Sequence, residues 1–197
     1  MAFLRWTSMA IVMLLAGCAR PEPTTSSSLF AGWSWSKINP ANWFGHSLLV
    51  TDRGVGELTA LTPMEQDTLS TSLHNNYRLR KAQESNGKGI VTFWQALQDN
   101  QVKLEIFGQS TVSRVVVMDD SARGPGGITT GTLYSKLYSK AYGICHTADE
   151  NQDTDVVCRA PGSQHIWYQF SGQWHGPKGL MPDDETLKNW QLNQIIW

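Results

Sequence analysis

Short apolar runs separated by turn-forming residues dominate the chain from residue 77 onward. Several of the runs alternate apolar and polar residues, and the others are continuously apolar. Runs of this length and pattern, bounded by Gly, Asn, Asp and Ser, are typical of β-strands joined by tight turns. In the first half the expected strands are YRLRK, GIVTFWQAL, QVKLEIFG and VSRVVVMD, at 77–81, 89–97, 101–108 and 112–119.

A helix is expected before these strands. The sequence TPME at 62–65 has the form of a capping box, with Thr62 as N-cap, Pro63 at the first helical position and Glu65 reaching back. Leucines four residues apart give the segment one apolar face. The pattern predicts a helix from Pro63 to Asn75.

The second half repeats this order loosely. Leu133, Leu137 and Ala141 have helical spacing and precede Gly143, a typical helix C-cap. The expected elements after this helix are strands YGICHT at 142–147, DVVCRA at 155–160 and HIWYQF at 165–170, a short helix opened by Asp183, and a strand LNQIIW at 192–197.

These elements predict one α+β domain over residues 29–197, built on antiparallel meanders with a few short helices. The two helix-plus-meander halves, 54–120 and 124–197, suggest a loose internal repeat. The alternative is one continuous sheet with no duplication.

The amino terminus has the parts of an export signal. Arg5 precedes the apolar run MAIVMLLAG, which is too short to span a bilayer as a stable helix. Leu15-Ala16-Gly17-Cys18 resembles the bacterial lipobox, so residues 1–17 are expected to be removed and Cys18 to be acylated. The alternative is an ordinary signal peptide with a chance cysteine. Ala19 after the lipidated residue resembles lipoproteins sorted to the outer membrane rather than those retained at the inner one.

A polar tether and an aromatic segment follow the lipobox. Residues 18–28 comprise Cys18 and ARPEPTTSSS, a Pro, Thr and Ser sequence with little to bury. The next residues include Trp33, Trp35, Trp43 and Phe44. These rings are a candidate binding surface near the membrane, and the alternative is that they pack against the domain.

Composition narrows the classes of partner. The chain has 16 Lys and Arg against 17 Asp and Glu among 197 residues, and its longest basic cluster is RLRK. The sequence therefore has no excess of positive charge of the kind that binds nucleic acid. Nine Trp residues supply large rings that combine an apolar face with a hydrogen-bond donor.

Two cysteines remain after Cys18. Cys145 and Cys158 fall in neighbouring expected strands of an exported protein, so a disulfide is predicted. The alternative is a metal site with His146 and His165, but the spacing fits no zinc module, and we expect neither a metal nor a cofactor.

Catalytic motifs of the common kinds are absent from the sequence. A hydrolytic site could still pair a distant carboxylate with a histidine and a hydroxyl nucleophile. The candidates are His46, His74, His165 and His175, the carboxylates Asp119 and Asp183, and the nucleophiles Ser135 and Thr130.

A family resemblance rests on five features: the lipobox, LTPMEQDTL, LYSKLYSKAYGIC, CRAPGSQHIWYQFSG and the ending LMPDDETLKNWQLNQIIW. Together they resemble the YfeY-like family of enterobacterial lipoproteins, described as RpoE-regulated. The resemblance implies a role in the cell envelope under stress and supplies no catalytic residues.

We therefore expect a non-enzymatic lipoprotein that binds or supports assembly of an envelope protein, lipid or peptidoglycan fragment. A small periplasmic hydrolase is the alternative. A cleft where a histidine, a carboxylate and a nucleophile converge would favour the enzyme.

Overall fold

The computed structural model describes residues 47–85, 89–148, 155–177 and 179–197. The chain divides into two units, 1–39 and 40–197, and the described residues all belong to the second. Several predicted features lie outside the described residues: the signal peptide, Cys18, the tether, and Trp33, Trp35, Trp43 and Phe44.

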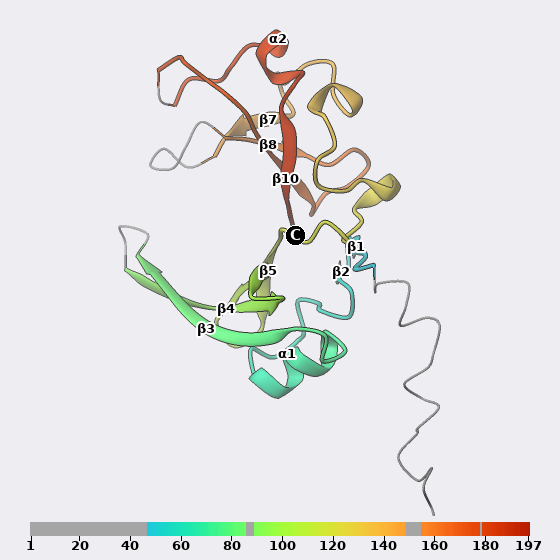
Figure 1. Cartoon of the computed structure of the whole chain (residues 1–197), viewed down its shortest axis with the longest axis vertical. Helices are drawn as coiled ribbons and strands as arrows, with labels where there is room; N and C mark the ends of the chain where they lie inside the picture. Colours follow the sequence, from blue (N-terminus) through green and yellow to red (C-terminus); the bar gives the residue numbers. More distant parts are fainter. Residues whose placement is uncertain (1–46, 86–88, 149–154, 178) are drawn as a thin grey trace, which may run out of the picture. The chain divides into compact units, whose positions relative to one another are not determined.

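One antiparallel sheet of eight strands organises the described residues (Figure 1). Its order is β3-β4-β5-β6-β10-β9-β8-β7. The strands are β3 (Arg78–Ser85), β4 (Ile90–Gln98), β5 (Gln101–Gly108), β6 (Val112–Val117), β7 (Cys145–Thr147), β8 (Val156–Arg159), β9 (Trp167–Ser171) and β10 (Gln191–Ile196). This confirms the predicted α+β class with antiparallel meanders and little helix.

Each half of the chain contributes one four-stranded meander, and the meanders join through their last strands. In the β6–β10 pair, Val117 and Val116 lie opposite Ile195 and Ile196. The backbone groups of Val115 and Trp197 exchange two hydrogen bonds of 2.8 and 2.9 Å, which extend this seam. The sheet is therefore continuous across both halves.

The predicted first helix is present but shorter than expected. Helix α1 covers Gln66–Ser72, and its N-cap is Glu65, which makes no side-chain capping bond. The predicted capping box is wrong, because Thr62 accepts a 3.0 Å hydrogen bond from the Thr59 amide instead. The backbone of residues 62–64 pairs with residues 110–112, which holds it in an extended conformation.

The predicted second helix, with Leu133, Leu137 and Ala141 on one face, is wrong. Only one 3₁₀ turn, η4 (Tyr134–Lys136), forms in this segment. Residues 131–135 donate and accept backbone hydrogen bonds with residues 188–192, which hold the segment beside β10 with Leu133 in an extended conformation. The apolar residues here thus pack from a non-helical backbone.

Smaller elements complete the described fold. The predicted short helix is confirmed: α2 (Asp184–Leu187) begins at Asp183, whose side chain accepts a 2.8 Å hydrogen bond from the Thr186 amide. The other elements are the hairpin β1 (Val50–Thr51) and β2 (Gly54–Val55), and the 3₁₀ turn η3 (Pro125–Gly127). None of the helices in the described residues is long and apolar enough to cross a membrane.

The hydrophobic core lies on one face of the sheet. Every buried apolar residue from outside the sheet, among those described, belongs to this large core. Contributors from outside the sheet include Leu58, Leu69, Tyr134, Ile166 and Leu187. The opposite face, which we call the outer face, carries a small cluster made only of strand residues: Phe93, Phe107 and Val116, with Ala82, Val91 and Ile196 beside them.

Candidate functional site

The two cysteines predicted to pair are joined in the structure. Cys145 in β7 and Cys158 in β8 are Cα partners in the ladder and form a disulfide. Both thiols are consumed, so neither is available as a thiolate ligand for the alternative metal site. Within the described residues no three metal-binding side chains cluster.

The carboxylates considered for a hydrolytic site have partners other than histidine. Asp119 is buried and accepts hydrogen bonds from the Tyr77 hydroxyl at 2.8 Å and the Ser121 amide at 2.9 Å. Burial alone would raise the pKa of Asp119, but the hydrogen bonds from Ser121 and Tyr77 and the charge of Lys103 lower it below 3.8. Asp183 caps α2, and its bonds to Thr186 lower its pKa.

The candidate histidines and nucleophiles are dispersed among the described residues. His74 lies 3.6 Å from the Glu57 carboxylate, while His165 and His175 are exposed in separate loops. Ser135 is exposed on η4, and Thr130 is half-buried before it. His46 lies outside the described residues. The structure does not bring the remaining candidates together.

One unpredicted serine does lie beside a carboxylate and near a histidine. Ser163 is buried, and its hydroxyl donates to Asp52 while accepting from the amides of His165 at 3.2 Å and Ile166 at 2.9 Å. The Ser163 bond lowers the pKa of Asp52, with a smaller contribution from the His165 charge. A nucleophile must give its proton to a base such as imidazole. Ser163 instead ties the 160–166 turn to the β1–β2 turn.

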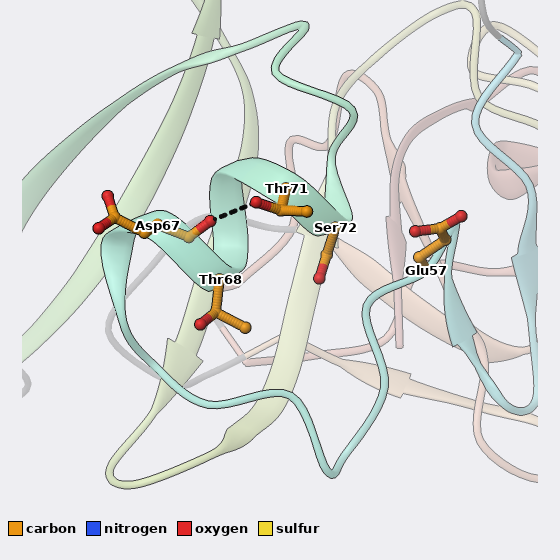
Figure 2. A pocket seen from close by; sticks show the side chains of 5 residues that line it. All are labelled: Glu57, Asp67, Thr68, Thr71 and Ser72. Carbon is orange, nitrogen blue, oxygen red and sulfur yellow. Dashed lines mark hydrogen bonds between the residues drawn. The ribbon is translucent and has the colours of Figure 1, made fainter.

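A shallow hollow lies between α1 and the turn after β2 (Figure 2). Its volume is about 330 Å³, and its lining is polar: Glu57, Asp67, Thr68, Thr71 and Ser72. Figure 2 shows the carboxylates of Asp67 and Glu57 on opposite sides of the view, with the Thr71 hydroxyl donating to the Asp67 carbonyl. The polar groups do not converge on one point, so the hollow does not form a defined ligand site.

The outer face carries the more organised arrangement. A row of directly opposed residues crosses the sheet with one member from each strand between β3 and β8, and we call it the cross-sheet row. Residues opposite one another in a ladder lie on the same face. The row consists of Arg80, Gln95, Glu105, Val116, Ile196, Trp167 and Arg159.

Hydrogen bonds connect the first three members of the cross-sheet row. Arg80 donates to the Gln95 side-chain carbonyl at 2.5 Å, and the Gln95 amide donates to the Glu105 carboxylate at 2.9 Å. The opposite end is aromatic: the Arg159 guanidinium lies 5.1 Å from the Trp167 ring centre. The cross-sheet row therefore begins with a polar network, continues through apolar residues and ends with the Arg159 guanidinium over the Trp167 ring.

A second cation on a ring lies next to the row. Phe93 and Phe107 stack with centroids 4.6 Å apart, and the Arg114 guanidinium carbon lies 4.1 Å from the Phe107 ring centre. Arg114 and Arg159 are exposed, and neither forms an ion pair with a carboxylate among the described residues. Stacking orients a guanidinium while leaving its N–H donors available to carboxylate or phosphate groups.

A polar cluster extends the outer face beyond Trp167. Asp155 accepts hydrogen bonds from Gln169 and Ser171, both at 2.8 Å, and Asn193 donates to the Ser171 hydroxyl at 2.5 Å. Asn193 lies at the irregularity in the β9–β10 register. Its buried Oδ1 atom has no hydrogen-bond partner among the described residues.

Sequence reasoning missed these outer-face residues. Arg114 and Arg159 appeared only as polar letters within the apolar runs VSRVVV and DVVCRA. A usable signal is alternation, which places Arg114 on the face opposite its buried neighbour Val115, and Arg159 on the face opposite its buried neighbours Cys158 and Ala160. The strand order that brings the two meanders together could not be read from alternation.

The described geometry can be compared with known proteins. Residues 32–197 match a family model described as a protein of unknown function, DUF1131. The chain belongs to this family. It is 45% identical over 181 residues to the uncharacterized protein YfeY of Escherichia coli K12, covering 91% of this chain and 95% of the relative.

A solved structure of a relative has a similar architecture. The crystal structure of the uncharacterized protein yfeY from E. coli matches with a TM-score of 0.68 and 44% sequence identity. The match covers 77% of this chain and 98% of the crystallised chain. The resemblance predicted from the sequence is therefore confirmed as a family relationship, and the comparisons assign no activity to it.

Proposed function

We propose that this chain is a lipid-anchored outer-membrane protein that faces the periplasm and binds an envelope component without catalysing a reaction. The anchor is supported by the lipobox ending at Cys18. The family model begins at residue 32, after both the predicted signal and the tether. Several acyl chains would hold the protein at the membrane.

The binding role rests on the outer face. Arg114 stacks on Phe107 and shares strand β6 with the apolar Val116, and Arg159 stacks on Trp167, which lies opposite Ile196. Such a face suits a partner that offers anionic groups beside apolar ones, as envelope proteins, lipids and peptidoglycan fragments do. The resemblance to RpoE-regulated lipoproteins supports envelope stress as the setting of the proposed binding.

Crosslinking in intact cells tests the role. We would compare the wild type with the Arg114→Ala, Arg159→Ala and doubly substituted variants, using Arg53→Ala and Arg123→Ala as matched controls. The controls replace exposed arginines that lie outside the eight-stranded sheet. We expect the crosslinked partner to be lost in the double variant and retained in both controls. An equal yield of the same partner from every variant would exclude the outer face.

We propose the amino-terminal aromatic residues as a separate binding segment. Trp33, Trp35, Trp43 and Phe44 follow a tether whose ten residues span roughly 18 Å on average. They would thus meet partners close to the anchored leaflet, where rings with both apolar and polar edges are favoured.

A further inference from the structure

Strand β3 is a long edge strand of the sheet, with no partner on its second side among the described residues. It pairs with β4 through all of its residues, from Arg78 to Ser85. No other described strand lies along its second side, and Figure 1 shows it at the border of the first meander. The other edge, β7, is only three residues long and is tied down by the disulfide. Long edges with free backbone groups readily pair with another strand.

The charges on β3 are divided along its length. Arg78, Arg80 and Lys81 occupy the first half, and Glu84 lies in the second half. All four are exposed, and none forms an ion pair among the described residues. A strand that is basic at one end and acidic at the other complements an antiparallel copy of itself.

We propose that β3 pairs antiparallel with β3 of a second copy of this chain, with Ala82 opposite Ala82 on the two-fold axis. A two-fold axis perpendicular to the sheet keeps directly opposed residues on the same face. Slipping by one residue would exchange the faces. In every allowed register, the sequence numbers of two opposed residues therefore differ by an even number.

Two registers of this kind engage the greatest length of β3, and charge selects between them. Centring on Lys81 places Arg78 opposite the partner's Glu84 twice, but it also places two ammonium groups opposite each other. Centring on Ala82 places Arg80 opposite Glu84 of the partner twice and Lys81 opposite the partner's Gln83 twice. Opposite charges across a ladder stabilise the pair, and like charges destabilise it. The Ala82 register has two favourable pairs and no unfavourable one.

The outer face supports the same register independently. Ala82 is half-buried and packs against the small cluster of Phe93, Phe107 and Val116. This cluster ends at Ala82 on the β3 side, because no further described strand continues it. Pairing at Ala82 brings the clusters of the two copies together and joins their outer faces. The small methyl side chain permits close approach at the axis.

Cysteine crosslinking tests the register directly in the full-length, membrane-anchored protein. Under mild oxidation, we expect Ala82→Cys to produce a disulfide-linked dimer on a non-reducing gel. Lys81→Cys, the matched control for the competing register, should remain monomeric. A dimer formed by Lys81→Cys, or the absence of any dimer with Ala82→Cys, would overturn the proposed pairing.

Charge reversal tests the pairing without a covalent bond. The dissociation constant of the purified full chain in detergent would be measured by sedimentation for Arg80→Glu, Glu84→Arg and the double variant. Each single reversal should raise the constant about tenfold, and the double reversal should restore it. Arg53→Glu, outside β3, should leave it unchanged. A monomeric wild type at tens of micromolar, or a double variant as weak as the singles, contradicts the proposal.

Discussion

Cys145 and Cys158 lie directly opposite each other in the β7–β8 pair, where their disulfide fastens the three-residue edge strand to the sheet. The bond closes a short loop, with a sequence separation of 13. Without it, β7 would be held only by a few ladder hydrogen bonds. The disulfide thus protects the edge of the second meander.

Removing the disulfide should lower thermal stability. A loop of this size corresponds to about 3 kcal/mol in the chain-entropy model, or roughly 6–12 °C in Tm for a domain of this length. Calorimetry with and without reductant measures the change. The doubly substituted Cys145→Ser, Cys158→Ser variant is the control, and its Tm should not respond to reductant. A wild type indifferent to reductant would show that the bond contributes nothing.

The Tyr77–Asp119 hydrogen bond should contribute to stability in a pH-dependent way. Burial and the Asp119 carboxylate raise the pKa of Tyr77, so its phenol stays protonated and donates. Tyr77→Phe leaves a buried carboxylate with one donor fewer, which should cost about 1–3 kcal/mol at neutral pH. Chemical denaturation of both proteins measures this difference.

Acidification should remove the Asp119 contribution. The folded state lowers the pKa of Asp119 below 3.8, so the unfolded state takes up the proton first as pH falls. The stabilisation is complete above 3.8 and is lost as pH falls through the folded-state value. The stability difference between wild type and Asp119→Asn should therefore shrink below pH 4, and a constant difference from pH 7 to pH 2 would contradict this account.

Acylation at Cys18 should decide where the protein resides. Cys18→Ala removes the thiol that receives the lipid, so the precursor should accumulate with residues 1–17 attached. Membrane fractionation and mass measurement would detect this. A mature, membrane-bound Ala variant would show that the segment is an ordinary signal peptide.

The aromatic segment near the anchor should affect binding more than stability. Trp33→Ala, Trp35→Ala and Trp43→Ala should leave Tm almost unchanged, because surface substitutions alter stability little. They should also reduce capture of the partner by crosslinking. The opposite result would be that the free energy of unfolding of every variant falls by roughly 3–5 kcal/mol, the value typical of core aromatic residues, and that the folded fraction still captures the same partner. In that case these rings belong to the core.

The strands were predictable because each shows its own local pattern. The run QVKLEIFG coincides with β5, and the QDN turn contains Asp99 and Asn100 with φ of 51° and 62°, a geometry that a two-residue hairpin requires. Asp183 was likewise readable as a cap. These features depend on neighbours a few residues apart.

The failures share a different physical cause. Thr62 and Leu133 occur in segments with good local helix signals. Both segments nevertheless form backbone hydrogen bonds with residues distant in the sequence, which keeps them extended. The pairing partners lie around residues 110 and 190. Helical periodicity within a short stretch of sequence gives no information about partners so distant. The outer-face arginines were missed for the same reason, since their significance depends on which strands become neighbours.

The seam between β6 and β10 has a consequence for biogenesis. Residues 195–197 provide the bonds that unite the two meanders, and they are the last part of the sheet to be synthesised. The first meander can form from local contacts, but one side of β6 stays unpaired until those residues have been synthesised. During that interval, chaperones would meet a first meander whose inner edge strand, β6, is unpaired.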